Sequence, residues 1–330
     1  MVRQDRLALT GLGGPDTVSN LVLKLLKIDH VCLNVADPRE AAARYAVQFG
    51  LEVRGQGDDR ATLACDYEPY SLELVRGEPL GQAHTAWQLR RSCSLDEARA
   101  HLAGAPNANW QDEGDTLVVR DPEGFEHHIV AFRDDADRRP AIARQTSSLA
   151  GLRPRKLGHI NRLTADLAAT TRFHTEVLGM EIADYLGDAG IWFHVNAEHH
   201  QMALVQGPVP HFHHLAFDYY DFGTLRSLFD NVAQHGRWLA WGPLRHGIAQ
   251  NICGYVRITE EPLLVECYVD MEQLEPDHEP RHWPDDRFSS NTWGPLPPRS
   301  YFRFDDEAVR YERDSLEMLG EKLPPLEVYT

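Results

Sequence analysis

Cysteine is scarce in this 330-residue sequence. The five cysteines are an odd number, and no two have C-x-x-C spacing: Cys32, Cys65, Cys93, Cys253 and Cys267. This pattern argues against a disulfide scaffold and against a cysteine-ligated zinc site. We therefore expect a protein of the reducing cytoplasm.

Positive charge and long apolar runs are also in short supply. The 33 Lys and Arg residues are outnumbered by 50 Asp and Glu, which gives a net charge of −17 with His neutral. Phosphates and anionic lipids attract clustered Lys and Arg, so we expect no nucleic-acid partner and no membrane partner. The apolar stretch NLVLKLL at 20–26 is short and contains Lys24. It fits neither a membrane span nor a signal peptide.

An internal repeat organises what is present. Five landmarks recur at an offset of 129 or 130 residues: His30 and His159, Asp37 and Asp166, Gly50 and Gly179, LELVRG at 72–77 and MALVQG at 202–207, and His84 and His214. A nearly constant offset over so many landmarks indicates a duplication. We predict five segments: an N-terminal extension at 1–26, a first half at 27–135, a linker at 136–155, a second half at 156–272 and a C-terminal tail at 273–330.

Each half has the same predicted order of elements. A strand is followed by an amphipathic helix, at 38–49 in one half and 167–178 in the other, and each helix is followed by a glycine in the cap position. Short alternating strands and a second helix follow, at 94–105 and 222–236. We predict an α+β fold of four tandem β-α-β-β-β modules, whose curved, partly closed, barrel-like sheets surround a cavity.

The segment PHFHHLAFDYYD at 210–221 contains three closely spaced histidines, the first being His211. Alternate side chains of a strand share a face. His213 would share its face with Leu215 and Phe217, which favour the core. His214 would share the other face with the small Ala216, which leaves room for a ligand. We therefore predict that His214, and not His213, faces the cavity.

Two further strands contribute polar residues to the predicted cavity. In GHINRL, His159 and Asn161 lie on the inward face, and in LLVECYVD, Glu266 lies between apolar residues. A buried carboxylate is costly unless it is paired or binds a metal. Two histidines and one carboxylate on three strands are typical of the facial triad of non-haem Fe(II) oxygenases, which leaves positions open for substrate and O2. For any one of these histidines, a plain structural role is the alternative.

The second half resembles the vicinal oxygen chelate superfamily and, within it, the type I extradiol catechol dioxygenases. The motifs GHI, HHLAFD and LLVECY carry this resemblance and imply the metal ligands His159, His214 and Glu266. FHVNAEHHQMAL resembles the strand with the acid–base histidine, which falls on His200. GPLRHGIAQNICGYVR resembles the segment whose histidine and tyrosine hydrogen-bond the catechol, which fall on His246 and Tyr255.

The resemblance implies extradiol cleavage of a catechol-type aromatic diol with O2 at an Fe(II) centre, with Mn(II) as the alternative ion. Such a reaction belongs to the catabolism of aromatic compounds. Asn161, Trp192 and Trp241 are the expected substrate-binding residues. Where relatives that cleave carboxylate-bearing catechols commonly have an arginine, this sequence has Trp241, which favours an apolar or aromatic substituent.

Several alternatives stay open at this point. His200 and His199 could form a surface pair, His246 could be exposed in a loop, and Tyr255 and Trp192 could simply pack in the core. The same fold also serves metal-dependent glyoxalase-like lyases and isomerases, and non-catalytic proteins that bind small molecules. We expect a homo-oligomer, either a dimer or a tetramer.

The first half and the tail complete the predictions. The repeat places His30, His84 and His128 where the second half has its three ligands. We expect a scaffold without metal there, because this set lacks a carboxylate and has no counterpart of His246 and Tyr255. The tail, rich in proline and aromatic residues over 271–304, could close the cavity or pack as a belt, and the charged stretch at 306–322 is expected to be a solvent-facing helix.

Overall fold

The structure is a computed structural model that describes all residues except 1–22, 135–151, 299, 305–306, 308–309 and 311–330. Most of the predicted N-terminal extension and linker therefore lies outside the described residues. The same holds for nearly all of the predicted helix at 306–322. The predicted domain limits stay a prediction.

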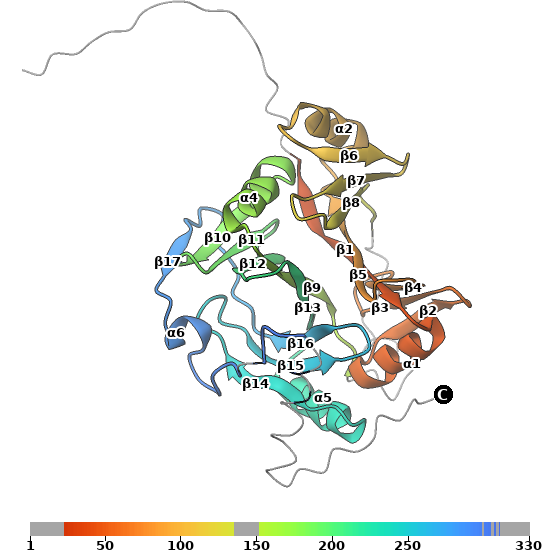
Figure 1. The fold of residues 1–330 in the computed structure, drawn as a ribbon, viewed down its shortest axis with the longest axis vertical. Coiled ribbons are helices and arrows are strands. Elements are labelled where there is room, and N and C mark those ends of the chain that lie inside the picture. Colours follow the sequence, from red (N-terminus) through yellow and green to blue (C-terminus); the bar gives the residue numbers. More distant parts are fainter. Residues whose placement is uncertain (1–22, 135–151, 299, 305–306, 308–309, 311–330) are drawn as a thin grey trace, which may run out of the picture.

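The described residues form two mixed sheets with the same topology (Figure 1). The elements of the first half are β1 (Leu25–Val35), α1 (Pro38–Phe49), β2 (Glu52–Gln56), β3 (Arg60–Ala64), β4 (Leu72–Arg76), β5 (Gly81–Leu89), α2 (Leu95–Gly104), β6 (Asn109–Asp112), β7 (Thr116–Arg120) and β8 (Glu126–Val130). Their strand order is β2-β3-β4-β1-β5-β8-β7-β6.

The second half repeats this arrangement and adds part of the tail. Its elements are β9 (Lys156–Thr164), α4 (Leu167–Arg172), the π-helix η2 (Phe173–Val177), β10 (Glu181–Leu186), β11 (Gly190–His194), β12 (Met202–Gln206), β13 (His211–Asp218), α5 (Phe222–Gln234), β14 (Leu239–Arg245), β15 (Ile252–Ile258), β16 (Leu263–Val269), β17 (Arg281–Trp283) and α6 (Arg287–Ser290). The strand order is β14-β15-β16-β13-β9-β12-β11-β10-β17. Apart from β17, the two orders correspond strand for strand, so the predicted α+β class with repeated β-α-β-β-β modules is confirmed.

Local sequence signals explain the helix limits. Asp37 accepts a hydrogen bond from the backbone N–H of Arg39 at the start of α1, and Pro38 takes the first helical position. Gly50 ends the helix with φ of 76°, and a Cβ there would lie 2.5 Å from the Leu152 carbonyl oxygen. The helix predicted at 38–49 is therefore confirmed to the residue.

The helix predicted at 167–178 was only partly right. It is α-helical to Arg172 and then widens into η2. Thr170 and Thr171 donate side-chain hydrogen bonds to the carbonyls of Asp166 and Leu167, and the His174 ring bonds the carbonyl of Thr170. Such local bonds compete with the regular helical ladder. A π-turn is the result, and it places His174 against the first half.

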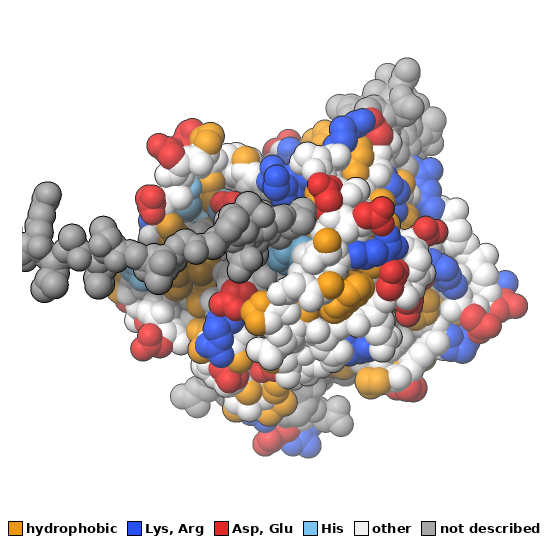
Figure 2. Space-filling view, turned by 90° about the horizontal axis from the view of Figure 1, so that it is seen from above, with side chains coloured by type: hydrophobic (Ala, Val, Ile, Leu, Met, Phe, Trp, Pro, Cys, Tyr) orange, Lys and Arg blue, Asp and Glu red, His pale blue; other side chains and the backbone are white. Residues whose placement is uncertain are grey.

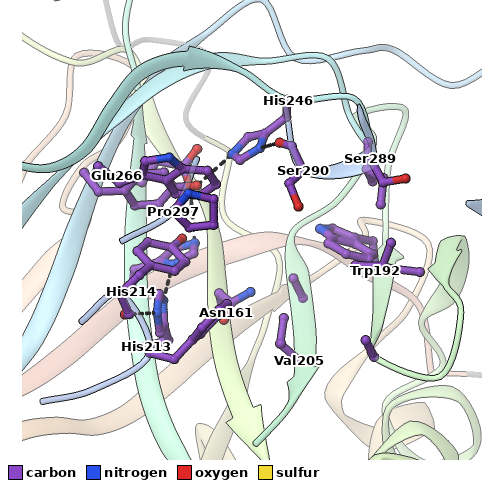
Figure 3. Close-up of a pocket in the computed structure, with 18 of the residues that line it drawn as sticks. Asn161, Trp192, Val205, His213, His214, His246, Glu266, Ser289, Ser290 and Pro297 are labelled. Atoms are coloured by element: carbon purple, nitrogen blue, oxygen red, sulfur yellow. Dashed lines mark hydrogen bonds and ion pairs between the residues drawn. The ribbon is translucent and has the colours of Figure 1, made fainter. Parts of the chain in front are cut away.

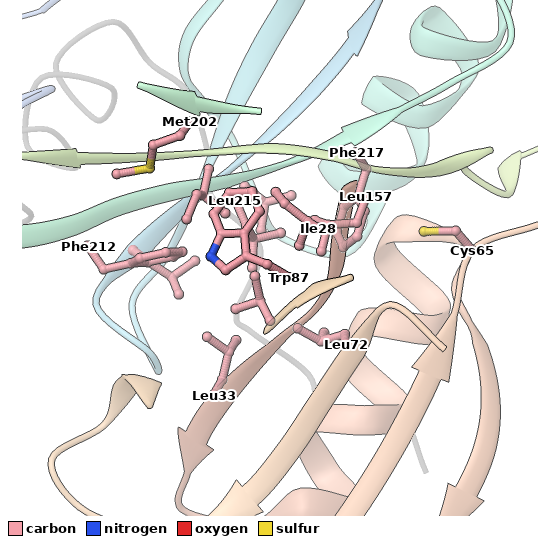
Figure 4. Close-up of a cluster of buried hydrophobic side chains, with 14 of the residues drawn as sticks. Ile28, Leu33, Cys65, Leu72, Trp87, Leu157, Met202, Phe212, Leu215 and Phe217 are labelled. Atoms are coloured by element: carbon pink, nitrogen blue, oxygen red, sulfur yellow. The ribbon is translucent and has the colours of Figure 1, made fainter. Parts of the chain in front are cut away.

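One apolar core joins the two halves. Figure 4 shows Ile28, Leu33 and Trp87 of the first sheet facing Leu215 and other residues of the second, and the buried apolar residues of both form a single cluster. Because the inner faces of both sheets are buried in this way, the far face of the second sheet is left to form a cavity.

Ion pairs cross the same interface. Arg162 on β9 is 1 % exposed and pairs with Asp121 and with Glu123, the latter at 2.9 Å. On the other side, Arg44 of α1 pairs with Glu261 at 2.7 Å. Buried charges persist only when they are paired in this way, so these contacts fix how one half sits on the other.

The described helices include none that is both long and apolar enough to cross a membrane. On the face shown in Figure 2, acidic and basic side chains are interspersed.

Candidate metal centre and active site

Three neighbouring strands bring the predicted metal ligands together. Ala216 on β13 is in register with His159 on β9 and with Glu266 on β16. His214 lies two residues before Ala216 on the same strand. The methyl group of Ala216 leaves space between its neighbours, so the imidazoles and the carboxylate converge there. His159 Nε2 lies 3.0 Å and His214 Nε2 lies 3.2 Å from the same oxygen, Oε2 of Glu266.

All three side chains are buried, and the other oxygen of Glu266 is occupied. Asn251 Nδ2 donates to Oε1 at 2.8 Å, which leaves Oε2 for the histidines. Burial opposes the charged form of Glu266, but His159 and His214 offset it and hold the pKa of the carboxyl well below its usual range. Burial lowers the pKa of His214 to about 4. At neutral pH, the pair is therefore a carboxylate facing a neutral imidazole.

The C-terminal tail determines which nitrogen of His214 carries the proton. His213 Nε2 donates to the Tyr301 carbonyl, which can only accept, at 2.9 Å. Burial keeps the pKa of His213 well below its usual value, so its ring is neutral and Nδ1 accepts from His214 Nδ1 at 2.8 Å. His214 Nε2 then carries no proton, and its lone pair faces a carboxylate oxygen at 3.2 Å. Two acceptors at this distance repel unless a cation lies between them.

The predicted position of His213 was wrong. The pairing of β13 with β9 shifts register between Phe212 and His214, so His213 is an extra, unpaired residue. Phe212 and Leu215 stay in the core, while His213 and His214 both line the cavity. Simple alternation cannot reveal such a bulge. Figure 3 shows both rings on the cavity side, joined to each other.

His200 lies at the end of a second buried chain of hydrogen bonds. His199 Nε2 bonds Asp184 Oδ2 at 2.9 Å, and His199 Nδ1 lies 3.1 Å from His200 Nδ1. Burial opposes the charge of Asp184, but His199 and Arg281 hold the pKa of this carboxyl far below its usual range. Burial lowers the pKa of His199, which is therefore neutral and accepts from His200 Nδ1. His200 Nε2 keeps its lone pair beside His159, whose ring centroid is 4.3 Å from that of His200.

The alternative that His199 and His200 form a surface pair is thus contradicted by the structure. His199 and His200 are 0 % and 4 % exposed. Asp184, whose carboxylate accepts the hydrogen bond from His199, lies fifteen residues earlier on β10. Residues of the tail hydrogen-bond this carboxylate as well.

A third chain of hydrogen bonds starts at the hydroxyl of Tyr255. This hydroxyl lies 2.9 Å from His246 Nε2, and His246 Nδ1 lies 2.6 Å from the Ser290 carbonyl of α6. Because the carbonyl only accepts, Nδ1 carries the proton and Nε2 accepts from the Tyr255 hydroxyl. Burial lowers the pKa of His246 and raises that of Tyr255 well above its usual value. The Tyr255 hydroxyl also interacts with the side chain of Tyr301, whose ring centroid lies 5.2 Å from that of Tyr255.

These groups line one cavity of about 330 Å³. It is lined by all nine residues that the sequence predicted: His159, Asn161, Trp192, His200, His214, Trp241, His246, Tyr255 and Glu266. Figure 3 shows Trp192 across the cavity from His214 and Glu266. Trp241 stacks on Tyr255 with ring centroids 5.3 Å apart and donates to the Pro295 carbonyl at 2.7 Å.

Sequence reasoning missed the residues that orient these groups. Asn251 lies within the motif that suggested His246 and Tyr255, so its position held a signal that was not used. Ser290 and Tyr301 act through backbone carbonyls, which have no sequence signature. The tail lies against the second half and lines the cavity with Ser289, Pro297 and Phe302, as a cover would.

The first half also has a polar cluster, and one premise about it was wrong. His30, His84 and His128 were expected to lack a carboxylate. The structure places Glu73 within 3.4 Å of His30 Nε2, and Glu126 2.7 Å from His128 Nε2.

Comparison with known proteins gives consistent results. Residues 156–261 match the family model of the Glyoxalase/Bleomycin resistance protein/Dioxygenase superfamily. A metapyrocatechase from Geobacillus stearothermophilus is 24 % identical over 257 residues, covering 71 % of this chain and 78 % of that protein. A manganese-dependent 2,3-dihydroxybiphenyl 1,2-dioxygenase from Geobacillus genomosp. 3 is 23 % identical over 290 residues, covering 80 % of this chain and 91 % of that protein.

Among solved structures, the anaerobic substrate complex of homoprotocatechuate 2,3-dioxygenase from Brevibacterium fuscum, with 3,4-dihydroxyphenylacetate, has a similar fold. The TM-score is 0.74 at 22 % identity, over 87 % of this chain and 94 % of that chain.

Proposed function

We propose that this chain, whose second half belongs to the Glyoxalase/Bleomycin resistance protein/Dioxygenase superfamily, is an extradiol dioxygenase. It would cleave the ring of a catechol beside the diol and incorporate both atoms of O2. The sequence relatives named as metapyrocatechase and 2,3-dihydroxybiphenyl 1,2-dioxygenase support this reaction class.

One observation carries the proposal. A neutral imidazole nitrogen of His214 and a carboxylate oxygen of Glu266, both acceptors, face each other at 3.2 Å, with His159 Nε2 3.0 Å from the same oxygen. Two imidazoles and one carboxylate are the ligand set of non-haem Fe(II) sites, so these residues fit such an ion. His159, His214 and Glu266 would hold Fe(II), or Mn(II) as in the manganese-dependent relative. When bound, the ion supplies a Lewis acid that lowers the pKa of a catechol hydroxyl.

His200 is the proposed acid and base. The chain of hydrogen bonds from Asp184 through His199 leaves His200 Nε2 unprotonated, with its lone pair at the cavity wall. It can take up a proton at Nε2, and the positive charge is then shared toward His199 and the Asp184 carboxylate. The same nitrogen can return the proton as the ring opens.

Tyr255 and His246 are the proposed groups that orient the diol. Because the Tyr255 hydroxyl donates to His246 Nε2, its oxygen can accept from a catechol hydroxyl in place of its interaction with Tyr301. A proton arriving at that oxygen can pass on to His246, whose other nitrogen is held by Ser290. Trp241, stacked on Tyr255, fixes the plane of the phenol.

The cavity favours a catechol with an apolar or aromatic substituent. Among the described residues that line it, there is no lysine or arginine to pair with a substrate carboxylate, and Asp285 would repel one. Trp192 and Asn161 supply an apolar face and an amide for substrate contacts.

Oxygen uptake tests the proposal directly. The anaerobically iron-loaded protein should consume O2 on addition of an alkyl- or aryl-substituted catechol and form a yellow ring-opened product. A glyoxalase-like lyase would turn over its substrate without O2, and a sequestering protein would bind catechol without product. Either result would replace the dioxygenase assignment.

We also propose a cytoplasmic homo-oligomer. All five cysteines are buried and free, which suits a reducing compartment. Phe288, Trp293, Leu296 and Phe302 of the tail are exposed apolar side chains close together in sequence, and a dimer or tetramer interface would cover them. Light scattering of the purified protein tests the assembly.

A further inference from the structure

We propose that the first half holds a second divalent metal ion, of the zinc type, on His30, Glu73 and His84. This site is independent of the proposed dioxygenase centre. It lies on β1, β4 and β5, which are neighbours in the first sheet.

The three side chains converge on one point. His30 Nε2 lies 3.3 Å from His84 Nε2 and 3.4 Å from Glu73 Oε2, and all three ligand atoms lie within 4.8 Å of one another. Zinc bonds of about 2.1 Å place the corners of a tetrahedron about 3.4 Å apart. The spacing therefore suits an ion with three protein ligands and a fourth, open position.

A buried carboxylate orients the central histidine. His30 Nδ1 lies 2.8 Å from Asp29 Oδ2, and Asp29 is 0 % exposed. The carboxylate accepts a hydrogen bond from the Nδ1–H group, and this orientation of the ring points Nε2 toward His84 and Glu73. A carboxylate behind a histidine in this way is the usual support of a metal-binding imidazole.

Glu73 has one oxygen directed at the cluster, and further carboxylates lie nearby. Glu73 keeps Oε2 for the cluster, because its Oε1 is taken by Arg60 at 2.5 Å. Beside His84, whose ring stacks on that of His128 at 3.7 Å, Glu126 supplies another carboxylate. With Asp29, three carboxylates lie at or next to the site, and each also pairs with an arginine: Asp29 with Arg133, Glu73 with Arg60 and Glu126 with Arg120.

The duplication provides an independent argument. His30 and His84 occupy the positions of His159 and His214. The carboxylate differs: Glu73 stands on β4, where the second half has Ala203 on the corresponding strand β12. The same pair of histidines thus meets a carboxylate on the opposite side.

A proton shared by His30 and Glu73 is the competing occupant. It would hold the same atoms together without any ion. Metal analysis separates the two cases, because only the ion is measured.

The experiment compares metal content in four full-length proteins. They are the wild type, a second-half variant (His159→Ala with His214→Ala), a first-half variant (Glu73→Gln with His84→Gln) and the combination of both. Each is equilibrated with zinc sulfate, dialysed and measured by inductively coupled plasma mass spectrometry. We expect about one zinc in the second-half variant and close to none in the combined variant, since metal binding requires the deprotonated ligand set.

Failure of this proposal differs from failure of the proposed function. A second-half variant that folds but retains no zinc overturns the first-half site. If instead the second half bound no metal, wild type and second-half variant would each retain one equivalent, and the first-half variant none.

Two controls keep the result interpretable. His282→Ala, an exposed histidine outside both clusters, should leave zinc content unchanged in the second-half background. If the first-half double variant fails to fold, His84→Gln alone replaces it, since His84 is only half-buried. Zinc should raise the melting temperature of the second-half variant, and His84→Gln should remove that shift; an unchanged shift would overturn the site.

Discussion

The two polar clusters of this molecule use the same two histidine positions but are centred on different strands. In the first half, His30 on β1 is the centre, between Glu73 on β4 and His84 on β5. In the second half, His214 on β13 is the centre, between His159 on β9 and Glu266 on β16. The carboxylate thus lies on opposite sides of the histidine pair in the two halves. Different neighbouring strands therefore complete the two clusters.

The clusters also differ in what lies over them. Residues of the tail, among them Ser290 and Tyr301, line the cavity of the second half and hold its histidines. The first-half cluster has no such contact among the described hydrogen bonds. The two halves of the repeat thus differ in the strand that carries the carboxylate and in the presence of one appended segment.

Removing the carboxylate of the second half should have the largest effect. Glu266→Gln is expected to abolish iron retention and turnover, because a neutral amide no longer offsets the charge of the ion. Iron content and oxygen uptake are the measurements. Glu275→Gln, an exposed residue of the tail, is the control. Full iron content with unchanged activity in Glu266→Gln would exclude the assigned ligand set.

The next comparison is between His200 and Tyr70, which occupy equivalent positions 130 residues apart. Each ring lies beside the first histidine of its half, with centroids 4.3 and 4.7 Å away. His200→Phe should keep iron and catechol binding but slow ring cleavage by roughly 10²–10⁴, the usual loss when acid–base catalysis is removed.

Tyr70→Phe should leave the rate unchanged. Single-turnover kinetics with catechol bound in advance measures both variants. If His200→Phe stayed within about twofold of wild type, the acid–base role would belong to another residue.

The contact between the halves should be the next most sensitive feature. Arg162→Met leaves Asp121 and Glu123 buried without their cation. The expected loss is about 3–5 kcal/mol of unfolding free energy, measured by urea denaturation. Arg99→Gln, which breaks exposed pairs within the first half, should not move the urea midpoint. Equal effects of the two variants would mean that Arg162 does not bind the halves together.

The smallest predicted effect is a pH dependence at the same interface. Burial lowers the pKa of His174 to about 4, with Arg162 opposing its charge as well and His127 facing it from the first half. Asp121 acts in the other direction but does not compensate. In the unfolded chain this histidine binds its proton near pH 6.5. Its contribution to the unfolding free energy is therefore at its full value above pH 6.5 and falls as the pH drops toward 4.

The loss should approach about 3 kcal/mol below pH 4. Urea titrations between pH 7 and 4 measure it, and His174→Gln should flatten this part of the profile. A slope that is the same in His174→Gln would assign the acid sensitivity to other groups, such as the buried His127.

Repetition and strand alternation made much of this fold predictable. The offset of 129 or 130 residues predicted the two halves, and capping residues such as Asp37 and Gly50 predicted α1 to the residue. The inward faces of three strands predicted His159, His214 and Glu266 as neighbours, and all three line the cavity. Their roles as ligands stay a prediction.

What escaped prediction depends on geometry that has no local signal. The bulge at His213 breaks the alternation of β13. In the sequence, Glu73 looks like any polar residue that alternates with leucines in a strand, and only the pairing of β4 beside β1 brings it to His30. The acceptors for His213 and His246 are backbone carbonyls, which every residue has.

The tail makes three anchoring contacts with the histidine chains, through Tyr301, Ser290 and the pair Arg281 and Trp283. If His214 binds an ion as proposed, docking of the tail and binding of that ion are thermodynamically linked. If the docked tail raises the affinity for the ion by some factor, the bound ion must strengthen tail docking by the same factor. Protection of residues 281–298 from a protease would then report on metal affinity, read at the edge of the protein instead of at its centre.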